Sequence, residues 1–243
     1  MIKQIIFENQ SKHKKDENME NKLQFKDSNW VKLSGVLSNP SEVKLPIVIL
    51  CHGLNSDKES STNTALNKVL TQNRIATLRF DFFAHGESDG DIDDRTVAEF
   101  VDDILSAISY LKSNGYKDIG IVGSSFGGLA AVIAASKTKD LKFMALKSPG
   151  MGKTSRTMTN YKTDFETKSW FEAAKTINVP TLIVHGKADV DVEIELGYEL
   201  AKNIKNSKIE IIEGADHRYT KKEDFNKAIE LISHFIIKNV QNP

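Results

Sequence analysis

The most constraining feature of this sequence is a regular alternation between short apolar runs and longer amphipathic segments. Pro46–Cys51 is a continuous apolar run, and Ile75–Phe80, Ile119–Val122 and Lys142–Lys147 follow at intervals long enough to hold a helix. Continuous apolar runs are typical of strands that are covered on both faces. Because strands that alternate with helices are joined by right-handed crossovers, the pattern predicts a mostly parallel sheet with helices on both sides.

The complete pattern predicts an eight-stranded α/β sheet whose first two strands are antiparallel. The expected strands are Leu23–Phe25, Trp30–Leu37, Pro46–Cys51, Ile75–Phe80, Ile119–Val122, Lys142–Lys147, Thr181–Val184 and Lys208–Ile212. The expected helices are Thr62–Gln72, Val97–Lys112, Phe126–Ser136, Trp170–Lys175, Ile194–Ile204 and Lys222–Val240. A capping box, Thr96-Val97-Ala98-Glu99, marks the start of the second helix.

Length and local composition set the domain organisation. A chain of 243 residues holds one substantial α/β core rather than two domains. Residues 1–20 are polar and are expected to be an N-terminal extension, and 21–243 form the single domain. Within it, 148–178 interrupts the alternation and is expected to form a small cap or lid.

Charge and cysteine content exclude several function classes. The 33 basic and 33 acidic side chains cancel, so nucleic acid is not expected as a partner. The single cysteine, Cys51, allows no internal disulfide and indicates a reducing compartment, so a cytoplasmic location is expected. No run approaches the ~20 apolar residues of a membrane-spanning helix. A homodimer is among the assembly states that the sequence permits.

A candidate nucleophile, Ser125, lies at the centre of Gly123-Ser124-Ser125-Phe126-Gly127. The motif follows an apolar strand and precedes an Ala/Gly-rich helix, which is the setting of a nucleophile on a sharp strand-to-helix turn. Glycines on either side relieve crowding around such a turn. The alternative is a glycine-rich turn with a passive serine, and Ser124 is the competing hydroxyl.

A serine nucleophile needs a base that is oriented by an acid, and both are expected after later strands. Asp189 follows the strand Thr181–Val184, and His217 follows the next strand, which gives the order serine, acid, histidine. Asp191 is the main rival for the acid. Asp216 is adjacent to His217 in sequence and poorly placed to accept from it.

The remaining histidines have simpler explanations. His52, His85 and His185 each precede a glycine in a loop, where an imidazole commonly bonds to loop backbone. His13 lies in the polar extension and His234 on the closing helix, and both are expected to be solvated.

Backbone N–H groups are expected to stabilise the oxyanion that forms when a serine attacks a carbonyl. One donor is the N–H of Phe126, directly after the nucleophile. The other is expected from the loop after Pro46–Cys51, where Leu54 is the first candidate and Asn55 the second.

Five ordered motifs carry a resemblance that spans about residues 23–240. They are His52-Gly53-Leu54, Arg79–Ser88, Gly123–Gly128, His185–Asp189 and Gly214–His217. Together they resemble the motif series of the α/β-hydrolase superfamily. Within it, the sequence is similar to bacterial cinnamoyl/feruloyl-type esterases and to the serine aminopeptidase and monoacylglycerol-lipase-like group. The resemblance implies the α/β-hydrolase fold.

The expected activity is hydrolysis of carboxylic esters of small to medium acyl groups, with Ser125, His217 and Asp189 as the triad and without a cofactor. Alternatives with the same triad are a thioesterase, an aminopeptidase and a monoacylglycerol lipase, and an alternative from another class is a non-catalytic binding protein of the same fold. The segment 148–178 is shorter than the lid usual in the feruloyl esterases. Its Tyr161, Phe165 and Trp170 either line an acyl pocket or pack within the segment.

Two further motifs are set aside. Gly150–Thr154 hints at a phosphate-binding loop, but Lys147 stands where that motif requires a glycine. Asp89–Asp94 resembles the opening of a calcium loop, but Asp94 replaces the required glycine. No His/Cys cluster has metal-ligand spacing, so no catalytic metal is expected.

Overall fold

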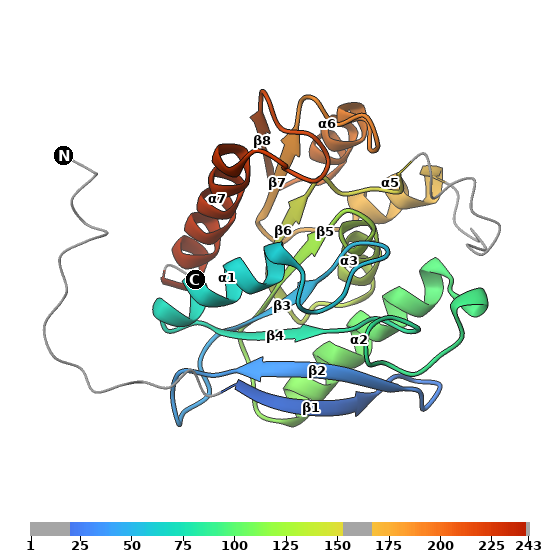
Figure 1. Cartoon of the computed structure of the whole chain (residues 1–243), viewed down its shortest axis with the longest axis vertical. Helices are drawn as coiled ribbons and strands as arrows, with labels where there is room; N and C mark the ends of the chain where they lie inside the picture. The colour runs from blue at the N-terminus through green and yellow to red at the C-terminus, as the bar shows by residue number, and fades with distance from the viewer. Residues whose placement is uncertain (1–19, 153–166, 242–243) are drawn as a thin grey trace, which may run out of the picture.

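A computed structural model describes residues 20–152 and 167–241, which form a three-layer α/β structure around one sheet (Figure 1). The strand order is β1-β2-β4-β3-β5-β6-β7-β8. The strands are β1 (Glu20–Lys26), β2 (Lys32–Ser38), β3 (Ile47–Cys51), β4 (Ala76–Phe80), β5 (Ile119–Ser124), β6 (Leu141–Lys147), β7 (Thr181–Gly186) and β8 (Ser207–Ile212). β1 and β4 both pair with β2 in antiparallel register, and every pairing from β4 to β8 is parallel. The eight-stranded, mostly parallel sheet is therefore confirmed.

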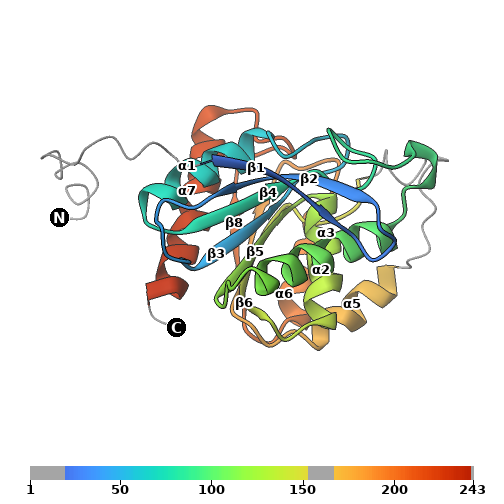
Figure 2. The same ribbon diagram turned by 90° about the horizontal axis from the view of Figure 1, so that it is seen from below.

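Helices cover both faces of this sheet (Figure 2). They are α1 (Ser61–Gln72), α2 (Val97–Ser113), α3 (Phe126–Lys137), α5 (Thr167–Lys175), α6 (Ile194–Asn203) and α7 (Lys222–Gln241), with a short 3-10 turn at Ile92–Asp94. α1 and α7 pack on one face, and α2, α3, α5 and α6 pack on the other. This arrangement places the carboxyl ends of the parallel strands, and the loops that follow them, along one edge of the sheet.

The central strand β3 shows why a continuous apolar run predicts a strand that is buried on both faces. All five of its residues are buried, and successive side chains point to opposite faces. Ile47, Ile49 and Cys51 enter the core beneath α2 and α3, whereas Val48 and Leu50 enter the core beneath α1 and α7. A strand buried on both faces has no polar face to alternate with, and its pattern is therefore unbroken.

The predicted elements are present, with small shifts at their ends. The Thr96 side chain accepts from the N–H of Glu99, so the predicted cap of α2 is confirmed. Glu20, which was assigned to the extension, instead belongs to β1, where it pairs with Ser38 and bonds Arg79. The rest of the predicted extension and the middle of the predicted lid, residues 153–166, lie outside the described residues.

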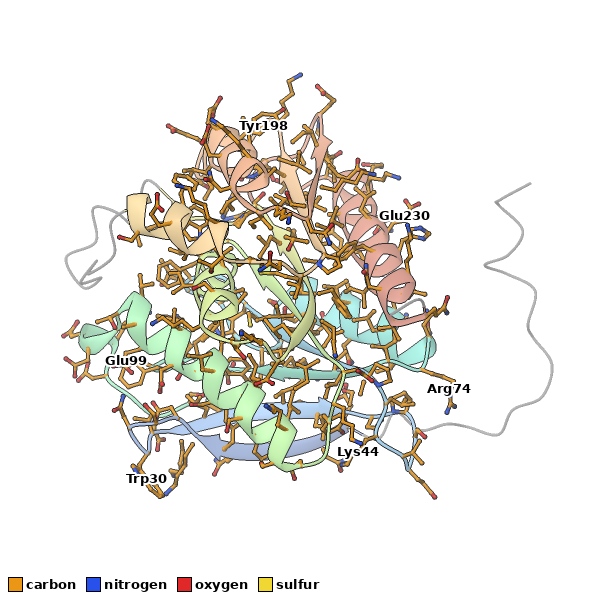
Figure 3. All side chains as sticks on the ribbon, turned by 180° about the vertical axis from the view of Figure 1, so that it is seen from behind. Trp30, Lys44, Arg74, Glu99, Tyr198 and Glu230 are labelled. Carbon is orange, nitrogen blue, oxygen red and sulfur yellow. The ribbon has the colours of Figure 1, made fainter. Side chains whose placement is uncertain are left out.

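Large exposed apolar side chains are scattered over the described surface. Figure 3 places Trp30 and Tyr198 at opposite ends of the molecule, where they are 76% and 49% exposed. Isolated apolar side chains of this kind are ordinary on protein surfaces. The homodimer therefore stays a prediction. Among the helices of the described ranges, none combines the length and apolar character that crossing a membrane requires.

Candidate active site

Ser125 occupies a sharp turn between β5 and α3. Its φ of 51° and ψ of −120° put a non-glycine residue in a sparsely populated backbone region. The turn is fixed on both sides, because the Ser125 N–H donates to the Lys147 carbonyl at 2.9 Å and the Ser125 carbonyl accepts from the Gly128 N–H at 2.9 Å. The Ser125 side chain is thereby held at the carboxyl edge of the sheet, at the start of a helix.

The flanking glycines are required by close backbone packing. A Cβ on Gly123 would lie 2.6 Å from both the Gly127 carbonyl oxygen and the Gly128 Cα. A Cβ on Gly127 would overlap the carbonyl oxygen of His52 on the neighbouring loop. Any larger residue at either position would push α3 away from β5 or from the loop after β3. The steric reason expected for these two glycines is therefore confirmed.

Ser125 is connected through His217 to Asp189. Ser125 Oγ lies 2.9 Å from His217 Nε2, and His217 Nδ1 lies 2.7 Å from Asp189 Oδ2. Asp189 follows β7, and His217 lies in the loop after β8. The structure thus brings together three side chains that are widely separated in the sequence, in the geometry expected from it.

Asp189 is held as a carboxylate in a buried position. Burial alone would raise its pKa, but hydrogen bonds with His185 and His217 and the N–H of Val192 bring the pKa below its ordinary value. Asp189 Oδ1 accepts from the backbone N–H groups of Asp191 and Val192 at 3.0 and 2.8 Å. With Oδ1 held in this way, Oδ2 is oriented toward the imidazole.

The rival acids are placed differently. Asp191 contributes a backbone N–H to Asp189, and no hydrogen bond or ion pair joins its carboxylate to His217. The Asp216 carboxylate accepts from both the backbone N–H and the hydroxyl of Thr220. Neither side chain occupies the position expected of the acid.

Three other histidines bond loop backbone, as expected. His52 Nδ1 lies 2.7 Å from the Gly53 carbonyl oxygen, and its Nε2 accepts from the Phe82 N–H at 3.1 Å. His85 Nδ1 lies 2.8 Å from the Phe83 carbonyl oxygen, and His185 Nε2 lies 3.0 Å from the Val192 carbonyl oxygen. Burial lowers the pKa of His52 to about 4, so this ring is neutral at pH 7.

The loop after β3 lies against Ser125. A Cβ on Gly53 would be 3.3 Å from the Ser125 Cβ, and Leu54 and Asn55 line the same cavity as Ser125. Phe126 is the first residue of α3 and is buried. The structure therefore brings the predicted donor positions Leu54 and Phe126 close to Ser125, and their role as oxyanion donors stays a prediction.

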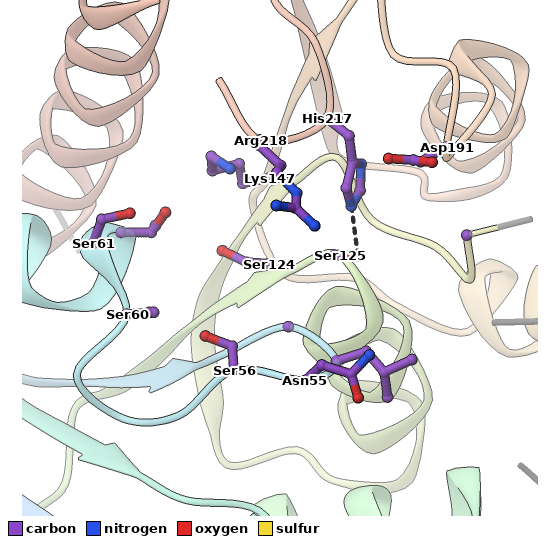
Figure 4. Close-up of a pocket in the computed structure, with 14 residues that line it drawn as sticks. Asn55, Ser56, Ser60, Ser61, Ser124, Ser125, Lys147, Asp191, His217 and Arg218 are labelled. Atoms are coloured by element: carbon purple, nitrogen blue, oxygen red, sulfur yellow. Dashed lines mark hydrogen bonds between the residues drawn. The ribbon is translucent and has the colours of Figure 1, made fainter. Parts of the chain in front are cut away.

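A cavity of about 540 Å³ opens beside Ser125 (Figure 4). Its described lining is largely polar: Gly53, Leu54, Asn55, Ser56, Ser60, Ser61, Thr62, Ser124, Ser125, Lys147, Gly152, Asp191, His217 and Arg218. Sequence reasoning missed Lys147, Arg218 and the serines near the start of α1. The only available signal was position, because Lys147 ends a strand and Arg218 and the serines lie in segments that follow strands.

The predicted acyl-pocket residues are not part of this described lining. Tyr161 and Phe165 lie outside the described residues. Trp170 is 2% exposed, belongs to the core beneath α2 and α3, and stacks on Phe171. An acyl-pocket role for Trp170 stays a prediction. Within 20–152 and 167–241, no group of three or more His, Cys, Asp or Glu side chains is arranged to hold a metal ion.

The family model described as "alpha/beta hydrolase fold" matches residues 46–158. This stretch contains Ser125 and ends before Asp189 and His217. A curated relative from Escherichia coli, the uncharacterized 31.7 kDa protein in the traX-finO intergenic region, is 32% identical over 103 residues. That match covers 41% of this chain and 36% of the relative, so the chain spans about a third of the curated relatives' length.

Solved structures match nearly the whole chain. Est1E from Butyrivibrio proteoclasticus, determined with ferulic acid bound, is 25% identical, with a TM-score of 0.78 over 90% of this chain and 100% of that one. The Pyrococcus furiosus esterase Pf2001 is 21% identical, with a TM-score of 0.78 over 95% of each chain, a likeness of fold alone. Together with the matched family model and the strand order, these likenesses show that the chain has the α/β-hydrolase fold.

Proposed function

We propose that this protein is a serine hydrolase that cleaves carboxylic esters through an acyl-enzyme, with Ser125 as nucleophile, His217 as base and Asp189 as the acid that orients it. The observation that carries the proposal is the continuous chain of contacts from Ser125 Oγ through His217 to the buried Asp189 carboxylate. A serine hydroxyl is a weak nucleophile by itself, and this arrangement supplies the base and its orienting group.

In the first half-reaction, Ser125 Oγ attacks the ester carbonyl carbon while its proton passes to His217 Nε2. The Asp189 carboxylate holds the Nδ1–H and stabilises the imidazolium that results. The developing oxyanion is stabilised by the N–H groups of Leu54 and Phe126 and by the N-terminus of α3. When the tetrahedral intermediate collapses, the bond to the alcohol oxygen breaks, and His217 returns the proton to the leaving alcohol.

In the second half-reaction, water attacks the acyl carbon of the Ser125 ester, and His217 accepts a proton from that water. Collapse of the second intermediate releases the carboxylic acid and restores the Ser125 hydroxyl. His217 accepts and returns every proton that moves: from Ser125 to the leaving alcohol in the first half-reaction, and from water back to Ser125 in the second. The chemistry therefore needs no metal or organic cofactor.

The similarity to Est1E, whose solved structure holds the carboxylic acid ferulic acid, supports an ester rather than an amide or thioester as substrate. Thioesterase, aminopeptidase and monoacylglycerol-lipase activities use the same attacking group. They are separated by a panel of 4-nitrophenyl esters, acyl thioesters, aminoacyl amides and monoacylglycerols.

The test of the triad is Ser125→Ala. We expect kcat/KM for 4-nitrophenyl acetate to fall by roughly 10⁴- to 10⁶-fold, and labelling by a fluorophosphonate probe to be lost. Ser136→Ala, at the last turn of the same helix, is the matched control and should retain both signals. Turnover or labelling that persists in a folded Ser125→Ala protein would overturn the assignment.

A further inference from the structure

Lys147 is a buried cation whose partner is missing from the described chain. It ends β6 and is 6% exposed, yet its ammonium has no hydrogen-bond or ion-pair partner within 20–152 and 167–241. The ammonium lies over the ring of Tyr219, whose centroid is 4.0 Å from Nζ. Buried lysines are normally paired with a carboxylate, because an isolated charge is costly to remove from water.

The nearest carboxylates are already occupied. Asp189 and Asp216 act on Lys147 through space, but neither lies within ion-pair distance of it. Asp189 is held by His217 and the loop N–H groups, and Asp216 is held by Thr220. Lys147 therefore lines the cavity with an ammonium that makes no hydrogen bond to any described residue.

Ser124 provides a second, independent observation at the same place. It is the register partner of Lys147 on the neighbouring strand β5, so the two side chains are adjacent at the carboxyl edge of the sheet. Ser124 is 9% exposed, and its buried Oγ has no hydrogen-bond partner among the described residues. Ser124 also lines the cavity beside Ser125. Buried hydroxyls rarely remain unpaired in folded proteins. The Ser124 hydroxyl is therefore, like the Lys147 ammonium, a group whose partner is not among the described residues.

The rest of this cavity wall also carries groups that favour an anion. Ser60 and Ser61 stand at the beginning of α1, where the helix dipole is positive. Arg218 lies at the exposed rim, beside His217. Figure 4 shows Ser124, Lys147 and Arg218 on the side of Ser125 that faces Ser61. Two cations, an unpaired hydroxyl and a helix N-terminus therefore surround one region of the cavity.

We infer that this region binds an anionic oxygen group of the substrate, so that the protein prefers esters whose acyl or alcohol half carries a carboxylate or a phosphate. The group would accept hydrogen bonds from Lys147 Nζ and Ser124 Oγ, with Arg218 closing it from the rim. This substrate class rests on the proposed ester hydrolysis at Ser125, whereas the anion site itself rests on Lys147 and Ser124.

The test compares charged and neutral esters of matched shape. On the acyl side, mono-4-nitrophenyl glutarate is compared with 4-nitrophenyl pentanoate. On the alcohol side, 3-acetoxypropanoate is compared with propyl acetate, followed by acid release. We expect kcat/KM for the anionic member of at least one pair to exceed that of the neutral member. In Lys147→Met this preference should fall about 10- to 100-fold, as for loss of a charged hydrogen bond.

Two variants make the comparison specific. Lys112→Met also removes one positive charge, but beside Asp140, at the opposite end of β6 from Lys147, and should leave the preference unchanged. Lys147→Arg keeps the charge and should restore part of the preference. The inference is overturned if the protein shows no preference in either pair, or if Lys147→Met retains the preference of the wild type.

Anion binding is also measured without turnover, by thermal shift with glutarate and with inorganic phosphate at constant ionic strength. A shift that disappears in Lys147→Met supports the site, and the stronger of the two anions identifies carboxylate or phosphate as the group recognised. No shift with either anion overturns the site. If the anions bind but no ester is cleaved and Ser125 resists fluorophosphonate, the proposed hydrolysis fails while the anion site stands.

Discussion

Two buried lysines occupy strand-exit regions of this sheet, and their surroundings are opposite. Lys58, between β3 and α1, is 5% exposed, and its Nζ lies 2.5 Å from Asp81 Oδ2 and 2.8 Å from Glu87 Oε2. Lys147, at the end of β6, is 6% exposed and has no carboxylate partner in the described chain. Burial is therefore the same in the two places, and only the pairing differs.

The pKa values of the two ammonium groups follow this difference. Burial alone would lower the pKa of Lys58, but its bonds to Asp81 and Glu87 raise it above the ordinary value. Burial lowers the pKa of Lys147 to about 8, and Asp189 and Asp216 offset this in part. A lysine paired within the fold contributes to stability, whereas an unpaired one beside the proposed nucleophile Ser125 is typical of a functional site.

Removing the paired lysine should have the larger effect on stability. Lys58→Met leaves the fully buried Asp81 carboxylate without its cation, so we expect the free energy of unfolding to fall by about 3–5 kcal/mol. Chemical denaturation measures this loss. Lys112→Met, which removes an exposed pair with Asp140, is the control and should cost less than about 1 kcal/mol. A Lys58→Met protein as stable as the wild type would mean that the Lys58 pairs are not what holds this loop.

Removing the unpaired lysine should change the free energy of unfolding in the opposite direction. Lys147→Met keeps the long side chain over Tyr219 but deletes a buried charge that has no partner. We therefore expect the free energy of unfolding to rise on the order of 1–2 kcal/mol, while the preference for anionic esters is lost. Stability and function then change in opposite directions, as expected where a group that binds a ligand also destabilises the fold. A destabilised Lys147→Met protein would show that the charge supports the fold.

The fold was predictable because its core signals are local. The five buried residues of β3 form an unbroken apolar run, and Thr96 caps α2 through a motif visible in four residues. Strand ends were less predictable. β7 continues through His185 to Gly186, beyond the predicted end at Val184, because its pairing with β8 persists where the apolar run has stopped.

The proximity of Ser125, Asp189 and His217 was predictable because each follows a parallel strand, and the carboxyl ends of such strands meet at one edge. The proposed role of Lys147 in anion binding was not predictable from the sequence. A lysine at the end of an apolar run indicates a solvated strand end, and its burial depends on Tyr219, which comes from a distant loop. The residues next to Lys147 in the sequence give no indication of its contact with Tyr219. That Lys147 has no carboxylate partner among the described residues can be recognised only after the neighbouring carboxylates have been located in the structure.

A pH series gives the smallest expected effect and isolates the Lys147 charge. Below pH 8 this lysine is protonated in both the folded and the unfolded chain, and the folded protein carries the cost of the buried charge. Between pH 8 and 10.5 the folded chain releases the proton while the unfolded chain still holds it. Wild-type stability relative to Lys147→Met should therefore rise with pH across this window.

The comparison isolates Lys147 because the other groups around it are present in both proteins. They are Asp189, Asp216, His217, Arg218 and Tyr219. The measurement is the difference between the unfolding free energies of Lys147→Met and the wild type at each pH, from denaturant titrations at constant ionic strength. We expect this difference to shrink above pH 8. Lys147 releases its proton in this pH range only if its ammonium is unpaired in the folded protein. A free-energy difference that stays constant up to pH 10 would therefore mean that Lys147 is paired with an anionic group, as Lys58 is.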